Sequence, residues 1–180
     1  MIKIVGGKYR SRLLFTPDEG TEPTKNRVRE ALMSALSDIL PGATVLDLFA
    51  GSGALGIESL SRGAKEAFFN DISPKTSALI QKNLNLLKET NGHVYTQDYL
   101  AFLGNANLPS FDIVFLDPPY AQKEAYQGAL DALLSRNLLK PYAAVVFEYE
   151  GGIAVDLTAF GRVKEYTYGK TKILIARREG

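Results

Sequence analysis

Five short apolar segments, separated by stretches with helical character, place the strongest limit on how this chain can fold. They are residues 45–49 (VLDLF), 66–71 (EAFFND), 93–96 (HVYT), 111–117 (FDIVFLD) and 144–149 (AVVFEY). Short continuous apolar runs are typical of parallel strands buried on both faces, and parallel strands need crossover connections between them. We therefore predict an α/β fold, with helices over residues 54–62, 74–89, 98–103 and 123–136.

Each end of the chain carries a pair of strands. Residues 162–169 and 171–178 follow one another so closely that they can pair only as an antiparallel hairpin. At the other end, residues 2–5 and 12–15 flank Gly6-Gly7-Lys8, which predicts a small N-terminal β-hairpin arm. The expected sheet is therefore mostly parallel and seven-stranded, with an antiparallel C-terminal hairpin.

A further helix is expected between the arm and the first of these apolar segments. From Asn26 onward, apolar side chains recur at the spacing of one helical face, at Val28, Leu32, Leu36 and Ile39. The pair Pro41-Gly42 would end this helix.

Composition limits both the domain count and the chemistry. A chain of 180 residues suits one compact domain, with residues 1–25 as an arm and 26–180 as the core. The absence of cysteine, together with a lone histidine, His93, excludes disulfides, thiolate nucleophiles and iron–sulfur clusters, and we expect no metal. No apolar run has the length of a membrane span or a secretory signal, so we expect a cytoplasmic protein. We also expect a monomer.

A glycine-rich turn follows the first apolar segment and precedes a helix, where an open α/β sheet binds its ligand. The residues expected to bind a cofactor here are Asp47, Phe49, Ala50, Gly51, Ser52 and Gly53. The spacing GSGALG also matches the dinucleotide fingerprint of oxidoreductases, and a turn that only permits tight packing is a further alternative. A nicotinamide cofactor is disfavoured by Asp47 within the strand and by the lack of a recognisable hydride-transfer partner.

The string from Asp47 to Gly53 resembles motif I of class I methyltransferases. This resemblance implies a Rossmann-like methyltransferase fold with S-adenosyl-L-methionine as the cofactor.

Two later strand ends supply candidate partners for an adenosine. Asp71 ends the second strand, where a carboxylate can accept hydrogen bonds from both ribose hydroxyls, and we favour it over its neighbour Asn70. Asp98 follows the third strand and can accept from an adenine amino group, although a helix N-cap explains it equally well. Ile72 and Tyr99 are expected in the same cofactor site.

The most specific string, Asp117-Pro118-Pro119-Tyr120, stands at the end of the fourth strand. Proline lacks an amide hydrogen, so this loop forms a rigid platform of acceptors. The Asp117 carboxylate and the Pro118 carbonyl can each accept one N–H of an exocyclic base amine and direct its lone pair towards the methyl donor. Tyr120 would stack on the base. A proline turn with a satisfied aspartate is the structural alternative.

The first twelve residues contain four cations and no acid. Lys8, Arg10 and Arg12 predict a phosphate-binding patch that would give the arm salt-dependent affinity for nucleic acid. A solvated hairpin is the alternative with no binding role.

With these residues placed, the chain resembles the RsmD family, bacterial methyltransferases that modify the N2 amine of one guanine in 16S ribosomal RNA. The matching strings are Gly6-Gly7-Lys8-Tyr9-Arg10 with Arg12-Leu13-Leu14, residues 23–32 (PTKNRVREAL), residues 46–53, Asp117 to Tyr120, and Tyr168-Gly169. The resemblance implies that the segment around Thr24, Arg27 and Arg29 closes over the cofactor site and that the arm helps to hold RNA. Glu22 departs from the family, which usually has an arginine there, and Met33 replaces a bulky aromatic residue.

The expected function is therefore methylation of a guanine N2 amine in small-subunit ribosomal RNA, with free RNA or an assembled particle as the partner. Two alternatives remain at this point. An adenine-N6 methyltransferase would use a closely related strip, and an RNA-binding module with a vestigial cofactor pocket would need only the basic arm.

Overall fold

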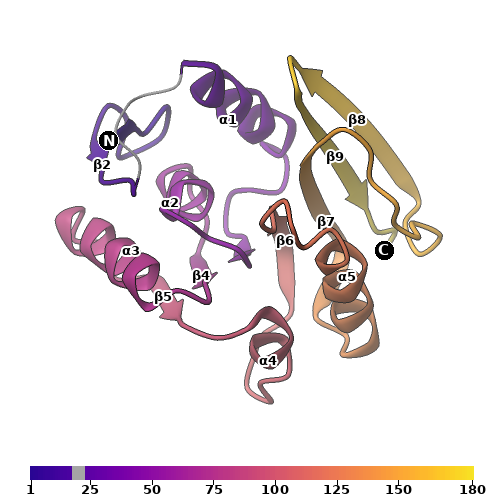
Figure 1. Ribbon diagram of the computed structural model, residues 1–180. Coiled ribbons are helices and arrows are strands. Elements are labelled where there is room, and N and C mark those ends of the chain that lie inside the picture. The colour runs from indigo at the N-terminus through magenta and orange to yellow at the C-terminus, as the bar shows by residue number, and fades with distance from the viewer. Residues whose placement is uncertain (18–22) are drawn as a thin grey trace.

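A seven-stranded sheet with the order β5-β4-β3-β6-β7-β9-β8 forms the centre of the molecule (Figure 1). The structure is a computed structural model that describes residues 1–17 and 23–180, except for the side chains of residues 23 and 24. Five strands run parallel: β3 (Thr44–Asp47), β4 (Glu66–Asn70), β5 (Gly92–Tyr95), β6 (Phe111–Leu116) and β7 (Leu139–Glu150). β8 (Arg162–Tyr168) and β9 (Thr171–Arg177) are antiparallel, which confirms the expected sheet and its closing hairpin.

Helices cover both faces of the sheet (Figure 1). One face carries α1 (Pro23–Ala35), α2 (Ala54–Ser61) and α3 (Pro74–Leu86), and the other carries α4 (Tyr99–Leu103) and α5 (Ala125–Ser135). Strand side chains alternate between two apolar cores, so that Val45 packs under α1–α3 and Leu46 under α4 and α5. None of the helices in the described ranges combines the length and apolar character needed to cross a membrane.

The N-terminal arm is a much shorter hairpin than expected. β1 (Ile2–Lys3) pairs antiparallel with β2 (Leu13–Leu14), whereas the sequence predicted strands over 2–5 and 12–15. The residues after β1 form hydrogen bonds with α2 instead: Val5 and Gly6 donate to Glu58, and Tyr9 N donates to Ser61 Oγ at 2.9 Å. Docking onto the core therefore replaces most of the hairpin ladder.

The carboxylate of Glu58 holds the arm, α1 and α2 together. Its side chain is 1% exposed and accepts from Val5 N at 2.8 Å, Gly6 N at 3.0 Å, and Arg29 Nε and Arg62 Nε at 3.1 Å each. Arg29 is buried as well and also donates to the Lys3 carbonyl at 2.7 Å. Charge-assisted bonds of this kind satisfy buried ions that would otherwise be costly to desolvate.

The first helix begins and ends earlier than predicted. It starts at Pro23, which suits the first helical position because that residue needs no amide hydrogen, and it ends at Ala35 rather than at Pro41-Gly42. The carbonyl of Ala35 accepts from Arg177 Nη2 at 2.8 Å, while Ile39 N bonds the Leu36 carbonyl, three residues back. A tertiary contact and tighter turns thus replace the last helical turn.

Two other boundaries differ because of local backbone conformation. α3 ends at Leu86 rather than at residue 89, since Lys88 adopts a left-handed φ of 55°. β7 begins at Leu139 rather than at residue 144, and it contains Pro141 and an irregularity in its register with β6. The remaining boundaries agree with the predictions to within three residues.

The Glu58 network predicts a large difference between two glutamates that both contact Arg62. Glu58→Gln keeps the shape but removes the charge that compensates buried Arg29, and it should lower the free energy of unfolding by about 3–5 kcal/mol. Glu30→Gln breaks a pair whose carboxylate is 48% exposed and should cost less than about 1 kcal/mol. Urea denaturation measures both values. Equal losses for the two variants would contradict the assigned role of Glu58.

Candidate active site

A cavity of about 370 Å³ lies at the carboxyl ends of the parallel strands. β3 lies between β4, which follows it in the chain, and β6, which the chain reaches later from β5. The strand order therefore reverses at β3, and such a switch point is where open α/β sheets bind ligands. The lining residues come from four strand ends and the loops that follow them: Leu48, Phe49, Gly51, Asn70, Asp71, Ile72, Gln97, Asp98, Tyr99, Asp117, Pro118, Pro119 and Gln122. The fold therefore brings the glycine turn, Asp71, Asp98 and the strip that begins at Asp117 into one site.

The glycine turn requires glycine at two positions. Gly51 and Gly53 have φ values of 56° and 81°, in the left-handed region that residues with a Cβ atom rarely adopt. A Cβ atom added to Gly51 would meet nothing within 4 Å, so this glycine opens the backbone towards the cavity. Of the predicted cofactor residues, Ala50, Ser52 and Gly53 do not line the cavity and instead shape the turn that leads into α2.

Asp47 lies beneath the turn rather than in the cavity lining. Its side chain is 4% exposed and accepts from Gly56 N in the first turn of α2 at 3.1 Å. Burial raises the pKa of Asp47 to about 7, although the Gly56 hydrogen bond lowers it, and the negative charges of Asp71 and Glu148 raise it further. The structure thus gives Asp47 a role in fastening α2 to β3.

The neighbours Asp71 and Asn70 have different surroundings. Asn70 is 1% exposed and exchanges two hydrogen bonds with the backbone of Gln97, at 3.0 and 3.2 Å, which ties the ends of β4 and β5 together. Asp71 accepts from Gly51 N at 3.1 Å with one oxygen and from Ser73 N at 3.0 Å with the other. Each carboxylate oxygen retains further acceptor capacity. Asp71 is therefore better placed than Asn70 to accept from a diol.

Apolar side chains form the walls of the same cavity. The rings of Phe49 and Tyr99 lie with centroids 5.4 Å apart, and Ile72 is 67% exposed although it is apolar. Asp98 caps α4, because its Oδ2 accepts from the amides of Leu100 and Ala101 at 3.1 and 3.4 Å, and it also lines the cavity. The position of Asp98 is thus compatible with both expected roles, a helix N-cap and an acceptor for an adenine amino group.

These residues fit an adenosine-containing cofactor. The apolar walls suit a planar base, the Asp71 carboxylate suits the ribose hydroxyls, and the open backbone at Gly51 permits close approach. The described residues include no group of three or more His, Cys, Asp or Glu side chains that could hold a metal ion.

Asp117 and Glu148 stand side by side at the carboxyl ends of β6 and β7. Leu116 pairs with Phe147 in the parallel register, so the next residue on each strand projects to the face that carries α1. The surrounding protein raises the pKa of Asp117, as do the charges of Glu148 and Asp47, while Lys25 of α1 lowers it. Asp117 remains open to the cavity, so water screens this shift more than it does at Asp47.

Glu148 is the residue that the sequence analysis missed. Burial raises its pKa, and the charges of Lys25 and Arg29 oppose that effect. A signal was present, because an acid interrupts the apolar run 144–149 close to its end, as Asp47 does in 45–49. Gln122 and Gln97, which line the cavity although Glu148 does not, lie in loops where no pattern marks them.

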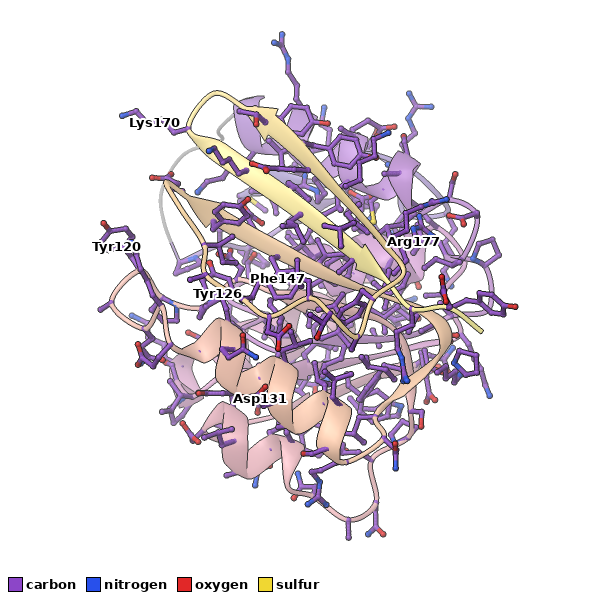
Figure 2. The ribbon with its side chains drawn as sticks, turned by 90° about the vertical axis from the view of Figure 1, so that its right-hand side faces the viewer. Tyr120, Tyr126, Asp131, Phe147, Lys170 and Arg177 are labelled. Atoms are coloured by element: carbon purple, nitrogen blue, oxygen red, sulfur yellow. The ribbon has the colours of Figure 1, made fainter. Side chains whose placement is uncertain are left out.

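The residues of the strip from Asp117 to Tyr120 lie partly in the cavity and partly on the surface. Pro118 and Pro119 line the cavity, and the Pro119 carbonyl accepts from Gln122 N at 2.8 Å. Within the described residues, no backbone N–H donates to the Pro118 carbonyl. Tyr120 lies outside the lining and is 77% exposed (Figure 2). The Lys123 ammonium lies 4.8 Å from the ring centroid of Tyr120.

The structure does not bring the cations of the arm into this cavity. Lys8 lies 3.6 Å from Glu89, and Arg12 donates to the Leu86 carbonyl at 3.2 Å, so both contact the C-terminal end of α3. Arg10 is exposed on the same turn of the arm, and Arg27 is exposed on α1 outside the cavity lining. The side chain of Thr24 and the whole of Glu22 lie outside the described residues.

Comparison with solved structures identifies the class of the fold. The structure superposes on a putative methyltransferase, yhhF, from Escherichia coli with a TM-score of 0.87 and 33% identity, covering 99% of this chain and 98% of that one. It superposes on the T. thermophilus 16S rRNA N2 G1207 methyltransferase in complex with AdoMet and guanosine with a TM-score of 0.74 and 20% identity, covering 98% of this chain and 49% of that one. The fold is that of a class I methyltransferase.

Sequence comparison identifies the family. The family model described as Conserved hypothetical protein 95 matches residues 2–177. The chain is 43% identical over 181 residues to Ribosomal RNA small subunit methyltransferase D of Escherichia coli K12, covering 99% of this chain and 90% of that protein. The protein of that name from Haemophilus influenzae is 40% identical over 153 residues, covering 83% and 79%. The chain belongs to this family, the RsmD family of S-adenosylmethionine-dependent methyltransferases, which confirms the expected cofactor.

Burial of Asp47 predicts a pH-dependent stability. The folded state keeps the proton up to about pH 7, against a usual pKa of 3.8, so it binds more protons than the unfolded chain between these values. The free energy of unfolding therefore falls as pH rises through this range. Asp47→Asn retains an acceptor for Gly56 N without the charge, and it should be more stable than the wild type at pH 8 by at least about 1.4 kcal/mol.

Urea denaturation between pH 4 and pH 9 tests this prediction. The stability difference should grow up to about pH 7, where Asp47 ionises, and then remain constant. Asp131→Asn, on the exposed face of α5, is the matched control and should show no such trend. A difference that is independent of pH would disprove the buried protonation of Asp47.

Proposed function

We propose that this protein methylates ribosomal RNA of the small subunit, at the exocyclic N2 amine of a guanine. The observation that carries this proposal is the position of Asp117, Pro118 and Pro119 in the same cavity as Gly51 and Asp71. An acceptor strip for an amine thus adjoins residues suited to an adenosine-containing methyl donor. The relatives named Ribosomal RNA small subunit methyltransferase D support the choice of RNA.

The chemistry required of the protein follows from the electronic structure of the base. The lone pair of an exocyclic amine is delocalised into the ring, so the amine is a weak nucleophile until it becomes pyramidal. Two acceptors, the Asp117 carboxylate and the Pro118 carbonyl, each take one N–H and stabilise that form. S-adenosylmethionine supplies an electrophilic methyl group on a sulfonium. No protein nucleophile or metal is required by this scheme.

The charges around Asp117 set its protonation. Only the ionised carboxylate accepts hydrogen bonds through both oxygens, whereas the surrounding protein and the charge of Glu148 favour the protonated form. Lys25 of α1 acts in the opposite direction on both carboxyl groups. The start of α1 therefore helps to keep Asp117 ionised, and Asp117 can accept the proton that leaves after methyl transfer.

Tyr120 provides an exposed ring at the outer end of the same strip. A base that leaves its stack needs a replacement surface, and stacking on an aromatic side chain contributes roughly 1–3 kcal/mol. Tyr120 is 77% exposed and is followed by Lys123, whose ammonium adds a positive charge near the bound nucleotide. We therefore assign Tyr120 to stacking on the base and Lys123 to the positive charge around the nucleotide.

The first test removes the proposed acceptor. Asp117→Ala should retain affinity for S-adenosylmethionine but lose turnover by at least about tenfold, the scale of one lost transition-state interaction of about 1.4 kcal/mol. Labelled cofactor and undermethylated small-subunit RNA or particles provide the assay, with Asp131→Ala as an exposed control. Mass mapping of the product identifies the base. Label found in adenine would contradict the guanine assignment and support an adenine-N6 methyltransferase. Calorimetry that shows no cofactor binding to the wild type would instead support an RNA-binding module without catalytic activity.

The second test separates the ring of Tyr120 from its hydroxyl. Tyr120→Ala should weaken the productive binding of RNA by about five- to 150-fold, which corresponds to the free energy of one stacked base. Tyr120→Phe keeps the ring and should behave like the wild type. Steady-state kinetics with varied RNA concentration measures both. A loss of equal size in the two variants would show that the hydroxyl, and not stacking, is important.

A further inference from the structure

The outermost strand of the sheet, β8, separates its side chains strictly by face. Arg162, Lys164, Tyr166 and Tyr168 alternate with Val163, Glu165 and Thr167. In the register with β9, Lys164 lies opposite Ile175 and Tyr166 opposite Ile173. Both isoleucines belong to the core under α1, so the cations and tyrosines all project to that face, whereas the only acid of β8 projects to the other.

A groove of about 390 Å³ lies on this face between β8 and the end of α1. Its floor includes Ile175, and its walls include Arg162, Lys164 and Tyr166 on one side and Ala35 on the other. Arg177 closes one end and is held in place by Asp38 at 3.0 Å and by the Ala35 carbonyl at 2.8 Å. The groove is therefore preformed and held by contacts within the chain.

The two cations of β8 are available for an anion. Arg162 and Lys164 are exposed, and among the residues the structure describes neither has a carboxylate within 4.0 Å. Lys164 lies 5.0 Å from the ring centroid of Tyr166, and the rings of Tyr166 and Tyr168 pack against the core under α1. Because alternate residues of a strand repeat at about 6.6 Å, the positive charges form a row along the groove.

From Arg162 to Tyr168, this face of β8 runs from the opposite end of the sheet towards the active-site edge. Tyr168 lies opposite Thr171, which lies opposite Glu150, so the far end of β8 reaches the sheet edge at which Asp117 stands. β8 is three strands from β6, about 15 Å across the sheet, and Lys164 and Arg162 lie about 13 and 20 Å from Tyr168 along the strand. Figure 2 shows Lys170, in the turn after β8, at the same end of the sheet as Tyr120, with Arg177 at the opposite end.

We propose that the α1-side face of β8, formed by Arg162, Lys164, Tyr166 and Tyr168, binds the sugar–phosphate backbone of RNA that flanks the target nucleotide. The proposal rests on the proposed function, because it assumes an RNA substrate in the active site. A groove that combines cations with aromatic rings is the arrangement that binds single strands without reading their sequence, and here two cations precede two tyrosines along β8. Arg162 and Lys164 lie about 20–25 Å from the edge at which Asp117 stands, so they would contact phosphates several nucleotides away from the target.

Charge on an edge strand also has a purely protective use, because it discourages pairing with a second sheet. A charge of either sign, on either face of the strand, would serve this protective purpose. This purpose does not account for a face that carries two cations and two tyrosines beside a groove, with the acid of the strand on the other face. The two explanations differ in what the cations do when RNA is added, so binding measurements separate them.

The experiment compares two double variants of the full chain. Arg162→Ala with Lys164→Ala removes both cations of the groove. Lys65→Ala with Arg136→Ala removes one lysine and one arginine that are also exposed, before β4 and after α5. Affinity for a small-subunit RNA fragment is measured over a range of salt concentrations, together with affinity for S-adenosylmethionine, thermal unfolding and methyl transfer to the same RNA.

The groove variant should bind RNA on the order of tenfold more weakly at 0.1 M salt, with the slope of log K against log salt reduced by roughly 1.4, as expected for two lost contacts to a single strand. Its KM for RNA should rise while kcat, cofactor affinity and thermal unfolding stay unchanged, and the control variant should match the wild type throughout. If the wild type methylates RNA but the groove variant shows the same slope and the same KM, the inference alone is overturned. A wild type that methylates no RNA would instead overturn the proposed function.

Discussion

The parallel register of β3, β4, β6 and β7 is the constraint on which the rest of the site depends. Parallel hydrogen-bonded strands end at the same edge of a sheet, so the residues that follow them converge although they are distant in sequence. Asp47 pairs with Phe115 and Phe69, and Leu116 pairs with Phe147. A carboxyl group at or just after a strand end therefore has other carboxyl groups as neighbours. Burial is the main cause of the raised pKa values of Asp47, Asp117 and Glu148, and the charges of neighbouring carboxylates raise them further.

Positive charge from outside the sheet counteracts that crowding. The first helix crosses the sheet face on which the carboxyl groups project, and Lys25 and Arg29 lower the pKa of Glu148. Arg29 is in turn held by Glu58, which also accepts from the backbone of the arm. One buried carboxylate on α2 thus orders both the arm and the helix that adjusts the electrostatics of the active site. Packing and chemistry are coupled through these ion pairs.

The RNA-binding surface that we propose differs from the one that a count of charges along the sequence suggests. The arm is basic in sequence, yet its contacts with Glu89 and Leu86 direct Lys8 and Arg12 towards α3. The C-terminal hairpin has a less distinctive composition, and its basic character emerges only when alternate residues of β8 are assigned to one face. A site at one edge of the sheet with an exposed Tyr120 beside it, together with a groove towards the other end of β8, suits a substrate much larger than a nucleotide.

The sequence by itself determined the sheet, the glycine turn and the proline loop after β6, because each depends on local chemistry. Apolar runs of strand length must be buried, glycines permit a left-handed turn, and two prolines restrict a loop wherever it lies. The structure alone decided what depends on neighbours distant in the chain. It ended the first helix at Ala35 through Arg177, placed Asp47 beneath the cavity, and brought Glu148 beside Asp117. Such contacts arise from strand order and register, which short-range patterns of residues do not encode.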